Sequence, residues 1–122
     1  MPWSYHQATG QMLFNGSLVA TGYSGHGPGL NNPAMQDDPD IGPIPVGTYT
    51  IGPQHFEKGK GPVVMALTPN PFNQMFGRDG FLIHGDNPAM DHSASHGCII
   101  LGPGFRKQIS GSSDRTLIVT AS

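Results

Sequence analysis

Apolar residues in this chain occur in short runs that glycine, proline, asparagine or aspartate interrupt. Within the runs, β-branched and aromatic side chains dominate, as is typical of strands. Five such runs lie in the part of the chain after residue 45: residues 46–52, 61–69, 79–85, 97–103 and 115–121. We expect these runs to form most of a sheet.

The N-terminal segment shows the same pattern in shorter pieces. Trp3 and Tyr5 alternate with polar residues, and residues 11–14 and 17–23 flank the pair Asn15-Gly16. Asn-Gly between two apolar runs is the strongest short-range signal for a two-residue hairpin turn. The segment therefore predicts short strands and one tight hairpin.

Three segments depart from the strand pattern. Residues 25–45 have no periodicity and carry a glycine or proline every few positions, which predicts a long loop. Residues 70–77 and 102–111 tolerate a helical turn or two. We therefore expect one mainly β domain over residues 1–122, a β-sandwich or mixed sheet with one or two short helices and long loops.

Composition and charge narrow the possible partners. Charged residues are only 11% of the chain and the net charge is -2, so no nucleic-acid or anionic-membrane patch is expected. The apolar runs are far shorter than the roughly 20 residues that span a bilayer, so we expect a soluble protein without membrane insertion. We also expect a monomer. The first ten residues show no signal peptide, and the chain is expected to be made in the cytoplasm.

The segment from His84 to Cys98 holds three of the six histidines and the only cysteine. If the runs containing His84 and Cys98 are neighbouring strands, the two side chains can meet. An imidazole in reach of a thiol can take its proton and lower the thiol pKa into the working range. The histidine then needs an orienting partner, and the Asp86 side chain or the Gly85 carbonyl could serve.

Gly97, directly before Cys98, also has a chemical reason to be glycine. Without a Cβ the backbone can turn sharply and aim N–H groups at a developing oxyanion, where each donor is worth about 3 kcal/mol. Ser95, His96, Gly97 and Cys98 together favour a nucleophile over a packed core cysteine.

These residues resemble a known family signature. A histidine followed after a spacer by Ser-His-Gly-Cys, here His84-Gly85 and residues 95–98, looks like the catalytic motif of L,D-transpeptidases of the YkuD type. Residues 42–51 resemble a strand that precedes this motif in that family. Across nearly the whole chain, residues 13–32, 42–53, 77–87 and 94–101 are similar to small L,D-transpeptidase-like effectors of type VI secretion.

The resemblance implies an L,D-transpeptidase-like fold and roles for individual residues. Cys98 would be the nucleophile, His84 its base, the Gly85 carbonyl the orienter, and the Gly97 and Cys98 N–H groups the oxyanion hole, with Ser95 and His96 shaping the pocket. The substrate implied is a peptidoglycan stem peptide, cleaved by L,D-carboxypeptidase action or modified by transpeptidation or D-amino-acid exchange through a Cys98 thioester. No metal or organic cofactor is implied.

The same resemblance implies an antibacterial toxin secreted into the periplasm of a target bacterium, with an immunity protein and a secretion component as partners. One departure is visible: many relatives carry an arginine where this chain has Ile100, and Arg78 is a candidate substitute. Tyr23, Ser95 and Asp86 are further candidates for substrate binding.

Two alternatives stay open at this stage. A zinc-dependent cell-wall peptidase could use His84, Asp86 and His96, with His92 and Cys98 as further donors, although no His-Glu-x-x-His or paired cysteine spacing is present. A wall-binding module without catalysis would use the same β scaffold but would not need the Ser-His-Gly-Cys turn. Loss of activity to a chelator would favour the first, and wall binding without turnover the second.

Overall fold

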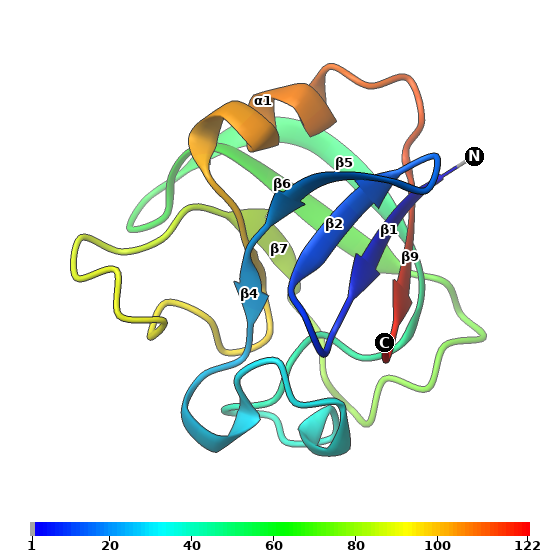
Figure 1. The fold of residues 1–122 in the computed structure, drawn as a ribbon, viewed down its shortest axis with the longest axis vertical. Helices are drawn as coiled ribbons and strands as arrows, with labels where there is room; N and C mark the ends of the chain where they lie inside the picture. Colours follow the sequence, from blue (N-terminus) through cyan, green and yellow to red (C-terminus); the bar gives the residue numbers. More distant parts are fainter. Residues whose placement is uncertain (1) are drawn as a thin grey trace.

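A computed structural model describes residues 2–122, so of the predicted domain only Met1 lies outside the described residues. The fold is mainly β, with nine strands, one α-helix and two 3-10 turns (Figure 1). The strands are β1 (Trp3–His6), β2 (Gln11–Phe14), β3 (Ser17–Thr21), β4 (Tyr23–Ser24), β5 (Gly47–Glu57), β6 (Gly61–Pro69), β7 (Leu82–His84), β8 (Ile99–Ile100) and β9 (Thr116–Thr120).

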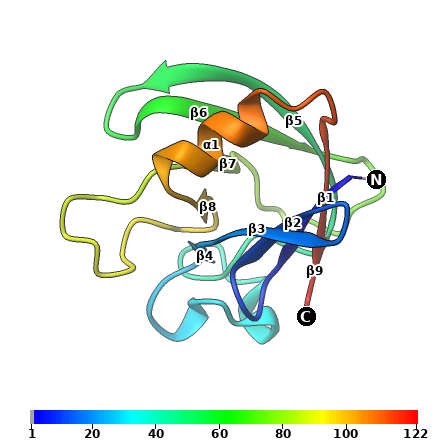
Figure 2. The same cartoon turned by 45° about the horizontal axis from the view of Figure 1, so that its top comes forward.

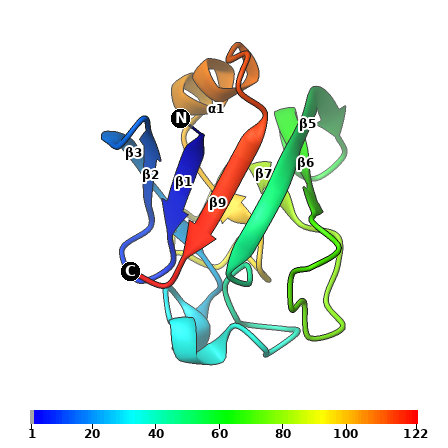
Figure 3. The same cartoon turned by 90° about the vertical axis from the view of Figure 1, so that its right-hand side faces the viewer.

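All nine strands form one mixed sheet in the order β3-β2-β1-β9-β5-β6-β7-β8-β4. Figure 3 shows β3, β2, β1, β9, β5 and β6 side by side across one side of the molecule. The two outer strands of this order, β3 and β4, are consecutive in the chain and are separated only by Gly22. The sheet therefore curls into a nearly closed barrel, which leaves little unpaired strand edge.

Gly22 is the residue that makes this closure possible. A Cβ built on Gly22 would lie 1.8 Å from the Ile100 carbonyl oxygen, so only glycine lets the chain pass this close to β8. Directly after it, β4 pairs antiparallel with β8, Tyr23 opposite Ile100 and Ser24 opposite Ile99. The N-terminal hairpin is thereby joined to the strand that follows Cys98.

The interior of the barrel is filled by alternate side chains of most strands. Its largest fully buried members are Trp3, Tyr5, Tyr49, Met12, Ile44, Met65, Ile83, Ile99, Ile109 and Leu117. Ile83 and Ile99 bring β7 and β8 into this core, and the two strands pair in parallel with Ile83 opposite Ile99 and His84 opposite Ile100. Because side chains alternate along a strand, His84 and Ile100 point to the opposite face.

Several sequence predictions are confirmed in detail. Asn15 and Gly16 form the two-residue turn between β2 and β3, with φ of 52° and 79° as a type I′ turn requires. The predicted C-terminal helix is α1 (Pro103–Ser110), which begins with proline and lies beside β5 and β6 at one end of the barrel (Figures 1 and 2). Among the described residues, no helix is long and apolar enough to cross a membrane.

The helical turn predicted over residues 70–77 is wrong. Asn73 explains why: its Oδ1 accepts from Thr48 N–H at 3.1 Å and its Nδ2 donates to the Thr48 carbonyl at 2.8 Å. These side-chain bonds fix the segment as turns against the start of β5, and asparagine competes with helical backbone bonding in this way. Phe76 and Gly77 then adopt positive φ, which no helix continues through.

The loop predicted over residues 25–45 is irregular, as expected, and contains the two 3-10 turns η1 (Gly27–Gly29) and η2 (Pro33–Met35). It forms the end of the barrel opposite α1 (Figure 1). Its backbone is fixed by many hydrogen bonds, several of them to the segment that precedes Cys98, and these are described next.

Candidate active site

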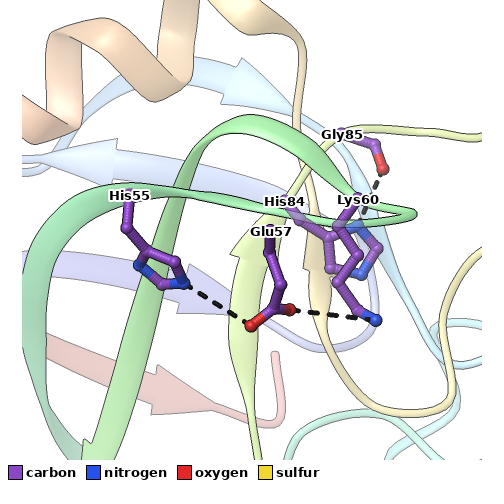
Figure 4. A network of polar contacts seen from close by, with 5 residues as sticks. All are labelled: His55, Glu57, Lys60, His84 and Gly85. Carbon is purple, nitrogen blue, oxygen red and sulfur yellow. Dashed lines mark hydrogen bonds and ion pairs between the residues drawn. The ribbon is translucent and has the colours of Figure 1, made fainter.

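His84 is the last residue of β7 and its side chain is only 4% exposed. Its Nδ1 lies 2.8 Å from the carbonyl oxygen of Gly85 (Figure 4), which is the contact an orienting carbonyl would make. With Nδ1–H donating to that oxygen, the neutral ring carries its free electron pair on Nε2. The ring is thus suited to accept a proton at Nε2.

Cys98 is half-buried and directly precedes β8. Its position two residues before Ile100 puts its side chain on the same face of the sheet as Ile100 and therefore as His84. In the parallel register of β7 and β8, the thiol and the imidazole therefore lie on the same face of the sheet, on neighbouring segments, with an offset of two residues.

The electrostatics of this pair differ from the sequence expectation. Burial raises the pKa of the Cys98 thiol, although a hydrogen bond from the Leu82 N–H and the charge of Lys60 act in the opposite direction. Burial also lowers the pKa of His84, with the Gly85 bond opposing it. Both shifts favour neutral groups, because a buried site stabilises ions poorly. Burial therefore opposes the lowered thiol pKa expected from the sequence, and both shifts favour a neutral thiol beside a neutral imidazole.

This state predicts the pH dependence of thiol alkylation. Since the pKa of Cys98 is raised, less thiolate is present at any given pH, and the iodoacetamide rate should reach half its maximum above the usual value of about 8.5. Cys98 is the only cysteine, so labelling followed by mass spectrometry reports one site. The urea-unfolded chain is the reference. A midpoint below that of the unfolded chain would instead indicate a preformed thiolate–imidazolium pair.

The turn before Cys98 is built around the hydroxyl of Ser95, which is fully buried. Ser95 Oγ accepts from the N–H of Gly25 at 2.9 Å and of Gly97 at 3.1 Å, and donates to the Cys98 carbonyl. The Gly97 N–H, predicted as an oxyanion donor, is therefore engaged by Ser95 in this conformation. The Cys98 N–H is the remaining candidate of the two.

Gly97 must be glycine for reasons of both conformation and space. Its φ is +134°, and a built Cβ would lie 2.5 Å from Arg78 Nη2 and 2.7 Å from the Phe81 ring. The Gly97 carbonyl accepts from Ser24 Oγ at 2.9 Å, and the same hydroxyl accepts from the Ile44 N–H. Ser24 thus joins β4, the loop of residues 25–45 and the cysteine turn.

Arg78 lies beneath this turn with 7% of its surface exposed, and its guanidinium stacks over Phe81. It donates to four carbonyl groups, those of Gln36, Gly42, Pro43 and His96, at 2.6 to 3.0 Å. Because these acceptors occupy the guanidinium, the geometry favours a positioning role over the substrate contact suggested by the sequence. His96 itself is exposed, and its Nδ1 lies 2.9 Å from the Asp40 carbonyl.

Tyr23 and Asp86, both predicted to bind substrate, contact each other. The Tyr23 hydroxyl donates to Asp86 Oδ1 at 2.7 Å and accepts from the Ala94 N–H at 3.2 Å. The segment between β7 and β8 projects from the barrel (Figure 2). These two hydrogen bonds connect both ends of this segment to Tyr23 of β4. Asp86 is therefore engaged by Tyr23, and the Gly85 carbonyl is the partner of His84.

Two adjoining cavities lie beside His84. One of about 200 Å³ is lined by His84 itself, and a larger one of about 650 Å³ lies between β4, the β5–β6 turn and the start of α1. They share Lys60, Gly85, Asp86 and Asn87. His84 lines the smaller cavity, and Cys98 lines neither of the two.

The described part of the chain does not provide the set of ligands that the zinc alternative requires. Among residues 2–122, no three histidine, cysteine, aspartate or glutamate side chains lie close enough to hold one metal ion. Nδ1 of His84 and of His96 each lie against a backbone carbonyl, and Asp86 accepts from Tyr23. The three ligands proposed from the sequence therefore have separate partners.

Some residues of this region were missed in the sequence. Ser24 and His26 hold the cysteine turn, His26 through Nδ1 at 2.8 Å from the Ser95 carbonyl. Lys60 and Arg106 line the larger cavity. They come from distant parts of the chain, so no local pattern links them to the cysteine.

Comparison with known proteins gives one match. A family model described as the Tlde1 domain matches residues 19–110, which are 92 of the 122 residues. The matched range includes every site residue described above. No curated protein matches the chain.

Proposed function

The chain belongs to the Tlde1 domain family, whose members are L,D-transpeptidase-like effectors of type VI secretion linked to peptidoglycan, and on that premise we propose that it acts on peptidoglycan stem peptides through a Cys98 thioester. The bond attacked is the amide between the L-centre of residue three and the D-centre of residue four. The observation that supports this most is the shared face of His84 and Cys98 across the β7–β8 register, with the imidazole fixed at Nδ1.

In the proposed acylation, Nε2 of neutral His84 takes the thiol proton as the sulfur attacks the carbonyl carbon of residue three. The oxyanion that forms is stabilised by the Cys98 N–H. The C–N bond then breaks, the imidazolium returns the proton to the leaving amine, and a thioester remains on Cys98.

Deacylation reuses the same base. When water attacks the thioester, His84 takes a proton from it and the thiolate leaves and is reprotonated, which completes carboxypeptidase cleavage to a tripeptide. When the amine of a D-amino acid attacks instead, the product is an exchanged tetrapeptide. Both outcomes share one acyl-enzyme, so the acceptor that reaches it decides the product.

Product analysis tests this function. Purified disaccharide tetrapeptide is incubated with the protein, with and without a D-amino acid such as D-methionine, and the products are weighed by mass spectrometry. We expect loss of one D-alanine without the added amino acid and exchange with it, both insensitive to EDTA and blocked by iodoacetamide. An unchanged muropeptide, or activity lost to EDTA and restored by Zn²⁺, would contradict the proposal.

The family assignment is consistent with delivery to target cells. We propose action in the target periplasm, where stem peptides are accessible, and inhibition by an immunity protein that covers the cavities beside His84. A monomeric state stays a prediction, as do the immunity protein and the secretion component as partners.

A further inference from the structure

The larger cavity beside His84 has a basic wall that the proposed chemistry has not yet used. Its volume of about 650 Å³ lies in the range of small-ligand sites. Lys60 comes from the β5–β6 turn and Arg106 from α1, while Ile100 and Met90 supply apolar surface. Asp86 is the acidic residue of the lining, and its Oδ1 already accepts from Tyr23.

Arg106 carries the stronger evidence for a ligand. The side chain is 6% exposed, and its Nε and Nη1 donate to the carbonyls of Leu101 and Pro62 at 3.0 and 2.6 Å. Nη2 has no hydrogen-bond partner within residues 2–122. A Cβ built on Gly85 would lie 2.8 Å from Nη2, which places this nitrogen against Gly85 at the cavity wall. Since Nη2 is not among the buried unpaired polar atoms of the described residues, it is accessible, and Arg106 lines the cavity, where a guanidinium N–H can donate to an anionic ligand.

Lys60 adds a second positive charge to the lining, two residues before Pro62, whose carbonyl Arg106 contacts. It is exposed and its one ion pair, to Glu57 Oε2, is long at 3.9 Å. Figure 4 shows Lys60 at the turn beside His84 and Gly85, with Glu57 also facing His55. Exposed pairs of this kind contribute little, so Lys60 can turn to a ligand at small cost.

We propose that Lys60 and Arg106 form a subsite for the free carboxylate of the residue on the leaving side of the scissile bond. This inference rests on the proposed function. Because His84 returns the proton to the leaving amine, the D-residue must lie beside His84, and its carboxylate is one carbon away from that amine. The cavity begins at Gly85, the residue after His84. An incoming D-amino acid, whose amine His84 deprotonates, would place its carboxylate in the same subsite.

Binding to a protein that cannot turn over substrate tests the subsite. In a Cys98→Ala background, calorimetric titration compares a stem tetrapeptide that ends in a free carboxylate with its C-terminal amide. We expect the amide to bind about tenfold more weakly, as loss of a charge-assisted contact implies. Lys60→Gln should weaken binding of the free acid about fivefold and reduce the difference between the two peptides.

Lys58→Gln is the matched control, since Lys58 lies on the same exposed turn and lines neither cavity. It should bind both peptides as the parent does. Equal affinity for acid and amide, or no effect of Lys60→Gln, would overturn the subsite. A third peptide, amidated only at the side-chain carboxylate of residue three, tests whether an internal carboxylate binds the subsite instead. If this peptide loses as much affinity as the C-terminal amide does, the assignment to the terminal carboxylate is wrong.

The readout does not depend on turnover. If wild-type protein leaves tetrapeptide unchanged while the acid-to-amide preference holds and requires Lys60, the subsite stands and the proposed reaction fails. If turnover is found without that preference, the reaction stands and the subsite fails.

Discussion

Cys98→Ala is expected to abolish release or exchange of D-alanine, with a loss of about 10⁴-fold or more, as is typical when a covalent nucleophile is removed. No other cysteine is present to form the thioester. His84 would still be oriented by the Gly85 carbonyl, but without the thiol this base can only activate water for direct attack on the amide. The measurement is the rate of tripeptide or exchanged tetrapeptide formation by chromatography and mass spectrometry.

The fold should survive this change. Cys98 is half-buried and removal of its sulfur deletes one small side-chain atom, so the expected cost is about 1 kcal/mol. Thermal unfolding of the variant serves as the control. Full turnover by a folded Cys98→Ala protein would remove the thiol from the mechanism and return attention to activated water.

The strand pattern could be predicted because it depends on local rules. Alternating and β-branched runs, together with Asn15-Gly16, indicated the strands and the hairpin, although β5 extends five residues beyond its predicted run and β7 and β8 are much shorter than theirs. The closure of the barrel could not be predicted in this way. It depends on the approach of Gly22 to the Ile100 carbonyl, a contact between residues far apart in the chain. The false helical turn over residues 70–77 has a similar origin, since Asn73 bonds to Thr48 rather than within its own segment.

In the candidate site, too, some features follow from a local motif and others depend on the whole fold. A local motif was enough to select His84, Gly85 and Cys98 as candidates, because motif residues adjoin one another in sequence or flank one loop. Their charge states were predicted less well, since burial depends on the whole fold, and it acts on Cys98 against the expected lowering of the pKa. Lys60 and Arg106 have no sequence signal at all.

Three arginines illustrate what the sequence does not reveal. Arg78, Arg106 and Arg115 would ordinarily be assigned to the surface, yet each donates to two or more backbone carbonyls. A chain with 18 glycines and 12 prolines has long irregular segments whose carbonyls lack partners in a sheet or helix. Buried carbonyls need donors, and a guanidinium offers five N–H groups in a fixed plane. Arg78 thus stabilises loop segments, whereas Arg106 and Arg115 bind carbonyls at the start of β6, at the irregular part of β5 and at the end of α1.

Arg78→Lys is expected to lower both stability and the rate of the chemical step. Lysine keeps the charge but cannot donate to the four carbonyls of Gln36, Gly42, Pro43 and His96 at once. Leaving two or more of them unpaired should cost about 3 kcal/mol and lower Tm by roughly 10 °C. Because His96 precedes Gly97 and Cys98, the turn loses its support, and a shifted nucleophile should reduce kcat about 100-fold with a smaller change in KM.

Arg115→Lys is the matched control for this experiment. Arg115 also donates to several carbonyls, including those of Ile51, Gly52 and Ser110, but contacts neither the cysteine turn nor the cavities beside His84. It should lose comparable stability and keep kcat when both variants are assayed well below their Tm. A selective rise of KM in Arg78→Lys, with kcat unchanged, would instead make Arg78 a direct substrate contact. A group that only binds substrate changes KM, whereas a group that positions the nucleophile changes the rate of the step that the nucleophile performs.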